Sequence, residues 1–327
     1  MKQVRATPFP WSGSIEMDYP TISVVIPTYN RGESLCSTIS SVLSQAYPGK
    51  TEVIVVDQTP QPSEEVAAFI HQHQKDLRYL RLTEANLPRA RNMGFAEAGG
   101  ELALFVDDDI ILPPDTLARL ASHFRPRGSR ALSGLVLNER DPASSLQGYA
   151  RKHGPRVSSP NPDLIEVRRF IGALMCVPAE TVRRVGGFDE HLGRLTSTAS
   201  GEDYDFCYRL RKAGVRLFID PSVRVIHRDC LAGGCEVRKI DPELAVRYQI
   251  RSLAYMSIKH HGRMGLRGWA TILRGFVLNS PAQHVLNRFS LARQAVAESE
   301  DFVCENHQQY AKKCTPGLPG KSFTRVN

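Results

Sequence analysis

The sequence has no run of about 18 apolar residues, roughly the length that a helix needs to cross a membrane. Its first 20 residues contain charged side chains at Lys2, Arg5, Glu16 and Asp18, which does not fit a signal peptide. The 7 cysteines are scattered without the spacing of a disulfide framework. We therefore expect a cytoplasmic protein with reduced thiols.

Excess charge of one sign is missing from most of the chain. Of the 42 basic and 34 acidic residues, 14 and 6 lie between Arg238 and Asn327, so residues 1–237 hold 28 of each. The whole formal charge of +8 therefore belongs to the C-terminal segment. This asymmetry predicts an anionic partner for that segment alone. It lacks a recognisable nucleic-acid-binding motif, so we do not expect nucleic acid as the partner.

Apolar segments of strand length alternate with segments of helical character. We expect strands at 22–26, 52–56, 78–82, 102–106, 131–137, 215–219 and 223–226, and helices at 33–45, 63–74, 88–98, 114–124 and 201–214. Such alternation predicts an α/β fold with a mostly parallel sheet flanked by helices. In these sheets, ligands bind at the carboxyl ends of the strands.

Three consecutive carboxylates, Asp107, Asp108 and Asp109, directly follow the expected strand at 102–106, and an apolar segment at 110–112 comes next. Adjacent carboxylates repel one another, and apolar flanks make them costly unless a cation is bound. A divalent ion that bridges a diphosphate would neutralise both sides. A solvated acidic turn is the alternative.

Two further residues end apolar strands. Asp57 could accept hydrogen bonds from a base or ribose, or it could form a turn. His227 could be a metal ligand or a strand-end histidine. With Cys230 and Cys235 it superficially suggests zinc, but that spacing supplies only three ligands.

The segment Gly201-Glu-Asp-Tyr-Asp205 opens an expected helix. Acidic residues in a first turn are ordinary partners of the helix dipole. The same dipole keeps a carboxylate ionised, as a general base must be. Both interpretations stay open on these residues alone.

Taken in order, these segments resemble family-2 glycosyltransferases with the so-called GT-A fold. The matching segments are Ile22-Ser-Val-Val-Ile-Pro-Thr-Tyr-Asn-Arg31, Asp57, Leu87-Pro-Arg-Ala-Arg-Asn92, Asp107 to Asp109, Gly186-Gly-Phe-Asp-Glu190, Gly201-Glu-Asp-Tyr-Asp-Phe-Cys-Tyr-Arg-Leu210 and His227. The resemblance covers residues 21–262. It implies inverting transfer from a nucleotide-diphosphate sugar to a hydroxyl of a glycan or lipid-linked saccharide, as in polysaccharide biosynthesis for the cell envelope.

The resemblance also implies a nucleotide site. Pro27, Tyr29 and Asp57 should hold the nucleobase, with Arg91 near the nucleotide. The chain departs from the family at Gln58, where many members have a second acid. This departure puts the choice of base or sugar in doubt more than binding itself.

Roles in chemistry follow from the same resemblance. Asp107 should contact the ribose, and Asp108 should belong to the same nucleotide-sugar site. Asp109 and His227 should bind a Mn²⁺ or Mg²⁺ ion. Asp203 should be the base that deprotonates the acceptor hydroxyl.

The expected organisation has a flexible N-terminal segment, a GT-A-like catalytic domain and a basic helical C-terminal extension. Their ranges are 1–20, 21–240 and 241–327, and the catalytic domain divides into a nucleotide-sugar-binding half at 21–112 and an acceptor-binding half at 113–240.

In the extension, basic residues recur at four-residue steps, and Gly262 and Gly265 should interrupt the helix. The basic residues are Arg247, Arg251, Lys259, Arg263 and Arg267, with Tyr255 in the one gap. Beside an apolar face, this stripe fits a peripheral helix on an anionic membrane, such as the inner face of the cell membrane. The alternative is a helix that packs on the catalytic domain with its cationic face solvated.

Two other functions use similar parts. A nucleotidyltransferase would need an early Gly-rich basic loop, and residues 27–32 are a poor candidate for one. A non-catalytic nucleotide-sugar-binding protein would need no base at Asp203.

Overall fold

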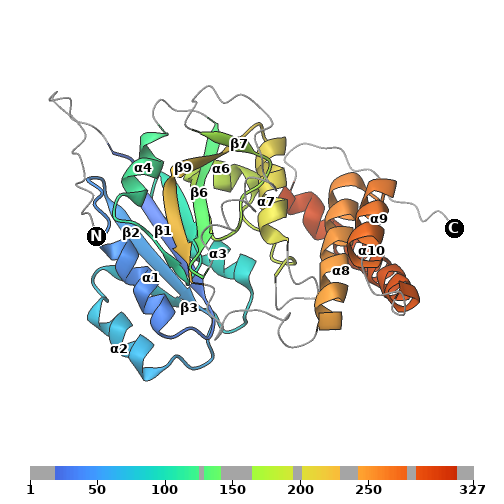
Figure 1. The fold of residues 1–327 in the computed structure, drawn as a ribbon, viewed down its shortest axis with the longest axis horizontal. Helices are drawn as coiled ribbons and strands as arrows, with labels where there is room; N and C mark the ends of the chain where they lie inside the picture. Colours follow the sequence, from blue (N-terminus) through green and yellow to red (C-terminus); the bar gives the residue numbers. More distant parts are fainter. Residues whose placement is uncertain are drawn as a thin grey trace.

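The computed structural model describes residues 19–124, 129–140, 164–193, 201–228, 242–277 and 285–314. Within these ranges, nine strands form one sheet with helices around it (Figure 1). The strands are β1 (Ile22–Thr28), β2 (Thr51–Asp57), β3 (Leu77–Arg81), β4 (Leu102–Val106), β5 (Ile110–Ile111), β6 (Arg130–Asn138), β7 (Ile165–Val167), β8 (Leu174–Pro178) and β9 (Arg216–His227). The helices are α1 (Glu33–Leu43), α2 (Glu64–Gln72), α3 (Leu87–Ala96), α4 (Thr116–Ser122), α6 (Ala179–Val185), α7 (Glu202–Lys212), α8 (Pro242–His261), α9 (Leu266–Ile272), the π-helix η2 (Leu273–Val277) and α10 (Val285–Cys314).

The strand order is β3-β2-β1-β4-β8-β6-β9-β5, and β7 pairs with β9. The first four strands of this order run parallel, because a helix connects each of them to the next in sequence. Strand β8 is antiparallel to both β4 and β6, so the other half of the sheet is mixed. The expected α/β fold is confirmed, with its parallel part in the N-terminal half.

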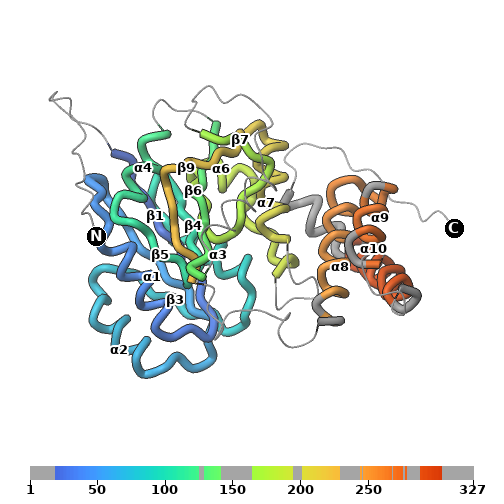
Figure 2. Tube along the Cα trace, in the orientation of Figure 1, coloured from blue at the N-terminus to red at the C-terminus, as the bar shows by residue number. Residues whose placement is uncertain are grey.

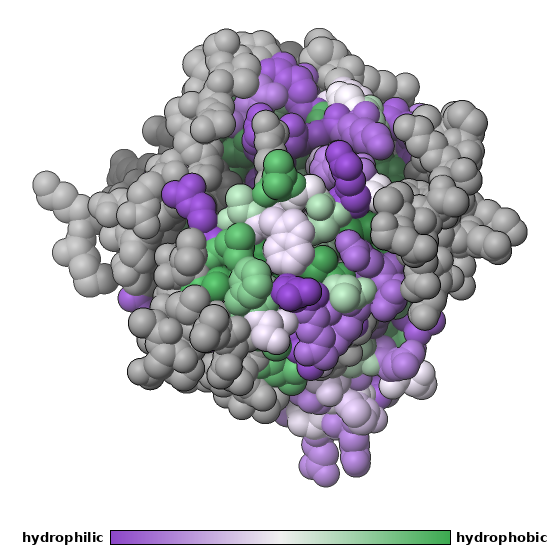
Figure 3. Space-filling view, turned by 90° about the vertical axis from the view of Figure 1, so that its right-hand side faces the viewer, coloured by the Kyte–Doolittle hydropathy of each residue, from purple (hydrophilic) through white to green (hydrophobic). Residues whose placement is uncertain are grey.

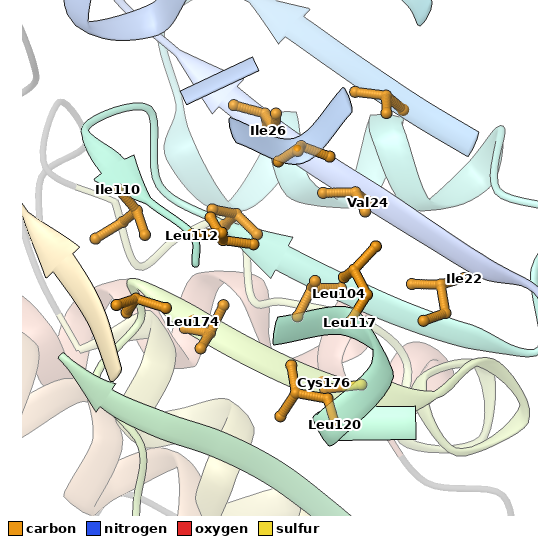
Figure 4. Packing of buried hydrophobic residues seen from close by; sticks show 14 of the residues in the cluster. Ile22, Val24, Ile26, Leu104, Ile110, Leu112, Leu117, Leu120, Leu174 and Cys176 are labelled. Atoms are coloured by element: carbon orange, nitrogen blue, oxygen red, sulfur yellow. The ribbon is translucent and has the colours of Figure 1, made fainter. Parts of the chain in front are cut away.

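Successive side chains of the strands point to opposite faces of the sheet, and both faces are covered. On one face, alternate residues of β1, β2 and β4 pack against α1, α2 and α4. Figure 4 shows this packing, with Leu104 of β4 close to Leu117 of α4. On the other face, Phe105 packs with Phe206 of α7, and Ile54 and Val56 pack with Ala90 of α3. Burial on both faces explains why these strands are continuously apolar.

One expected pair of strands is a single strand. The segments at 215–219 and 223–226 both belong to β9, whose pairing with β6 shifts register between Gly134 and Leu135. Val223 crosses directly over Gly134, where an added Cβ would lie 2.4 Å from the valine Cγ1. The expectation of two strands was wrong because Pro221 and Ser222 form a local irregularity inside a strand that continues. The strands β5, β7 and β8 were not expected.

The C-terminal helices α8, α9, η2 and α10 gather at one end of the molecule, drawn in orange and red in Figure 2. They have a hydrophobic core of their own, made largely of residues from α8 and α10. The expected helical character is confirmed for 242–277 and 285–314, and Gly262, at φ 77°, follows the last residue of α8. None of the described helices combines the length and apolar character that a bilayer-crossing helix needs.

One expected boundary and most of the expected N-terminal segment fall outside the described ranges. Residues 1–18 make up most of the expected N-terminal segment, and residues 229–241 contain the expected end of the catalytic domain, together with Cys230 and Cys235.

Candidate active site

The polar residues that end the strands meet at one edge of the sheet. Thr28 at the end of β1 lies opposite Asp57 at the end of β2, and Asp107 to Asp109 follow β4, the other neighbour of β1. His227 at the end of β9 pairs with Ile110, directly after the acidic residues. The topology therefore brings residues from four strands to one edge, as expected for a ligand site in such a sheet.

Asp108 is buried at the centre of this edge. One of its oxygens accepts hydrogen bonds from the Thr28 hydroxyl (2.7 Å) and the Tyr29 backbone N–H (3.4 Å), and the other accepts from Nε of Arg31 (3.1 Å). Burial raises the pKa of Asp108 to about 6, although the nearby Arg31 guanidinium lowers it. Asp108 therefore binds the loop after β1 to the loop after β4.

Asp109 and His227 lie side by side. Nε2 of His227 is 3.4 Å from Oδ1 of Asp109, and the second carboxylate oxygen of Asp109 is 2.9 Å from a guanidinium nitrogen of Arg31. A carboxylate and an imidazole this close fit two ligands of Mn²⁺ or Mg²⁺, ions that take much of their coordination from water and substrate phosphates. Within the described ranges, no three His, Cys, Asp or Glu side chains form a potential metal cluster. Asp109 and His227 are thus the side chains of this edge that could hold such an ion.

Arg31 is a site residue that the sequence reasoning did not single out. It contacts both Asp108 and Asp109 and is largely buried. A signal for it was present, because three adjacent carboxylates need positive charge nearby, and Arg31 is the basic residue of the loop that follows the central strand. It supplies that charge from the protein itself.

Asp57 is buried and forms a turn, which is one of the two roles that its sequence position suggested. Oδ1 accepts a hydrogen bond from the Thr59 backbone N–H (2.7 Å), and Oδ2 accepts from the Tyr79 hydroxyl and from Arg81 (3.2 Å). Burial and the hydrogen bond to Asp57 raise the pKa of Tyr79 to about 12, so this phenol stays protonated. Tyr79 and Arg81 lie on β3, and neither was expected as a partner of Asp57.

The residues expected around the nucleobase differ in accessibility. Pro27 is buried within β1, opposite Val56. Tyr29 is half-buried in the loop after β1. Gln58 is buried and ties three segments together, because its side chain donates to the Thr28 carbonyl (3.1 Å) and accepts from the Asn86 N–H (2.6 Å). The Gln58 amide thus connects the end of β1 to the residue that precedes α3.

Arg91 connects the two halves of the site. It lies on α3, which begins after Asn86 caps the helix by accepting from the Arg89 N–H. Its side chain is 1% exposed. The guanidinium donates to Asp107 (2.8 Å) and the Gly172 carbonyl (3.1 Å), and it lies 3.3 Å from a carboxylate oxygen of Glu202. Burial lowers the pKa of Arg91, but Asp107 and Glu202 outweigh this effect, so the net shift is upward.

Asp203 stands next to this connection, in the first turn of α7. One of its oxygens accepts from the Gly172 N–H (3.2 Å) and the other from the Tyr204 N–H (2.7 Å). In the described part of the chain, no cationic side chain lies within ion-pair distance of it. Gly172 thus faces Arg91 with its carbonyl and Asp203 with its N–H.

The other two acids of the same segment are engaged in ion pairs. Glu202 is buried against Arg91. Asp205 is fully buried beside Arg209 (2.8 Å), Lys259 (2.8 Å) and His260 (2.8 Å). Among the described residues, Asp203 is therefore the acid of this segment whose carboxylate makes no ion pair.

The turn at Gly187 and Phe188 is anchored to α3, the helix that carries Arg91, through Asn92. Asn92 accepts a hydrogen bond from the Phe188 N–H (2.7 Å) and donates to the Phe188 carbonyl (2.8 Å) and to Glu190 (3.0 Å). Gly187, at φ 70°, passes so close to Asn92 that an added Cβ would lie 2.6 Å from its side-chain oxygen. The backbone conformation and the close approach together require glycine here.

The sequence was compared with known protein families and curated proteins. The family model described as "Glycosyl transferase family 2" matches residues 23–192, more than half of the chain. A pre-mycofactocin glycosyltransferase of Mycobacterium tuberculosis is 28% identical over 228 residues, which cover 68% of this chain. The aligned region spans 45% of the length of that relative, less than half.

The fold was compared with solved structures. The mannosyltransferase PcManGT from Pyrobaculum calidifontis, in complex with GDP-Man and Mn²⁺, has a TM-score of 0.53 and 20% identity, covering 95% of this chain and 80% of that one. Residues 1–349 of TarS from S. aureus, in complex with UDP-GlcNAc, have a TM-score of 0.58 and 16% identity, covering 88% and 92%. At these identities the likeness shows a shared fold.

Proposed function

Because this chain belongs to glycosyl transferase family 2, we propose that it moves a sugar from a nucleotide-diphosphate sugar to an acceptor hydroxyl, with inversion at the anomeric carbon. The observation that supports this most is the chain of contacts from Asp107 through Arg91 and Gly172 to Asp203. It sets a carboxylate that has no cationic partner among the described residues beside the acidic edge where the nucleotide should bind. A transfer reaction needs this neighbourhood of donor site and base.

The donor site in this proposal is the edge formed by the loops after β1, β2 and β4. Tyr29 and the turn at Asp57 border the nucleobase. Asp107 faces the ribose, and a hydrogen bond from Arg91 holds Asp107 in place. Asp108 holds the loops together from its buried position. Two related folds carry GDP-Man and UDP-GlcNAc, which supports a nucleotide-activated sugar as the donor class.

A divalent ion, Mn²⁺ or Mg²⁺, would be held by Asp109 and His227, and it would draw negative charge from the departing diphosphate. Arg31 already neutralises part of the acidic edge before the donor arrives. The protein is therefore not left with two uncompensated buried carboxylates when the donor site is empty.

Asp203 acts as the base. Its carboxylate takes the proton of the acceptor hydroxyl while that oxygen attacks the anomeric carbon, and the bond from this carbon to the diphosphate oxygen breaks. The products are the inverted glycoside, the nucleoside diphosphate and protonated Asp203, which then releases its proton to water. Two backbone N–H groups hold the carboxylate in place for this step.

The acceptor approaches over an exposed surface beside Asp203. Tyr204 and Ile171 are 43% and 40% exposed, although both side chains are large and apolar. The guanidinium of Arg169 lies 5.8 Å from the ring centre of Tyr204. An aromatic and an aliphatic side chain next to the base suit the apolar face of a sugar ring in a glycan or lipid-linked acceptor.

We propose contact with an anionic membrane through the last part of the expected stripe, next to the start of α9. Three of the five basic residues of the expected stripe, Arg247, Arg251 and Lys259, are engaged in ion pairs with acids of α10 and the catalytic domain. Leu266 at the start of α9 is instead 90% exposed, and Arg263 precedes it in an exposed position. Figure 3 shows this end of the molecule, where apolar surface is bordered by polar side chains.

Release of nucleoside diphosphate tests the proposal. We expect release from a suitable nucleotide sugar with Mn²⁺, strong stimulation by acceptor, and a product of inverted anomeric configuration by NMR. A nucleotidyltransferase would release pyrophosphate instead, and a non-catalytic binder would bind the donor without turnover. A product with retained configuration would contradict the role of Asp203.

A further inference from the structure

One lysine of the C-terminal extension is buried between two acids of the catalytic domain. Nζ of Lys259 lies 2.7 Å from Oδ2 of Asp189 and 2.8 Å from Oδ1 of Asp205. All three side chains are almost completely buried. Burial lowers the pKa of Lys259, but the two carboxylates outweigh this effect and raise it, so the amine is charged.

The two acids belong to two different segments of the acceptor side. Asp189 follows the turn that Asn92 of α3 holds at Phe188. Asp205 lies two residues after Asp203 on α7. A single ammonium group therefore joins the turn after α6 to the helix that carries the base.

Other residues of α8 contact the same two segments. The Tyr255 hydroxyl donates to Asp189 (2.8 Å), and the His260 ring lies 4.1 Å from the Tyr208 ring of α7, centre to centre. Met256 packs against Gly201, the residue before α7, where an added Cβ would be 2.9 Å from the methionine Cε. Helix α8 thus borders α7 at its start, its first turn and its second turn.

We propose that Lys259 is a positioning residue: it fixes the start of α7, and with it Asp203, relative to the turn at Asp189. This inference rests on the proposed role of Asp203. The extension is then part of the catalytic unit, and its central basic residues bind acids of the same chain. Displacing a reacting group by about 1 Å can reduce turnover by roughly 100-fold, even when the change is made at a distance.

The primary test compares Lys259→Met with Arg247→Met. Both changes remove a basic residue from α8, but among the described residues Arg247 pairs with Glu298 of α10 and with no acid of α7. For Lys259→Met we expect kcat with acceptor to fall about 100-fold, while the Kd for the donor stays within about twofold. Arg247→Met should keep both values. Lys259→Arg, which retains a cation between the two acids, should recover part of kcat.

Hydrogen exchange gives a measurement that does not depend on activity. Amides at the start of α7 should exchange faster in Lys259→Met than in the unaltered protein, and should not change in Arg247→Met. If Lys259→Met does not fold, Asp189→Asn removes one of the two anchors and should give the same changes in weaker form. Normal kcat in the folded fraction, or unchanged exchange at α7, would overturn the proposal.

The two proposals fail in different ways. An unaltered protein that binds donor but never transfers sugar would contradict the proposed function, whereas the exchange at α7 would still show whether Lys259 holds this helix. Active protein with a Lys259→Met variant of normal kcat would contradict the positioning role alone.

Discussion

Replacing Arg91 by Met should destabilise the protein far more than a matched change at the surface. The buried guanidinium of Arg91 compensates Glu202 and donates to the Gly172 carbonyl. Met has a comparable length but no charge and no donor, so it would take the Arg91 ion pair away from a buried carboxylate. Removing one member of a buried ion pair costs about 3–5 kcal/mol, and we expect a loss of that size in the free energy of unfolding.

The matched change is Arg78→Met. Arg78 also pairs with a glutamate, Glu97, at 3.0 Å, but the two side chains are 49% and 52% exposed. Exposed pairs contribute about 0–1 kcal/mol, because water and salt screen them. Urea denaturation without nucleotide measures both variants, provided that the slope m stays the same. A difference below about 1 kcal/mol between them would refute the reasoning.

A double-mutant cycle identifies the cause. Glu202→Gln removes the negative charge that loses its Arg91 partner in Arg91→Met, so the double variant should lose clearly less stability than the sum of the two single losses. Simple additivity would mean that the cost comes from packing around Arg91, including the Phe188 ring that lies 5.2 Å from its guanidinium carbon.

Three further predictions concern chemistry and location. Asp203→Asn should reduce kcat by about 100-fold to 10,000-fold, the range of general-base catalysis, with donor affinity unchanged; an equal loss of donor binding would make Asp203 structural. Asp109→Ala should abolish the stimulation by Mn²⁺ and should resemble chelator treatment, and full activity in chelator would remove the ion from the mechanism. Leu266→Glu should weaken co-sedimentation with anionic vesicles at low salt, and equal binding by both proteins would exclude α9 as the contact.

The alternation of apolar strands and helices predicted the parallel half of the sheet well, because both faces of β1, β2 and β4 are buried and each connection contains a helix. It predicted less of the mixed half. The irregularity at Pro221 looked like the end of a strand, since nothing in the local sequence shows that Val223 packs against Gly134 of β6.

The candidate site shows the same limit. Acids at strand ends could be placed at one edge from the sequence, because that edge follows from the fold. Their partners could not, since Tyr79, Arg81 and Lys259 become neighbours of acids only through tertiary packing. The regular spacing of basic residues in α8 suggested a surface, yet the side chains at 251 and 259 are largely buried against acids far away in the sequence.

Gly172 has a consequence for protein engineering. Its carbonyl binds Arg91 and its N–H binds Asp203, so one peptide segment is shared by the donor side and the acceptor side of the proposed site. If one of these sides came from a homologue, Arg91 and Asp203 would come from different parents. Only one of them would then match the Gly172 segment that both contact. Chimeras designed to change the acceptor should therefore retain residues 170–174 and α3 from the same parent as α7.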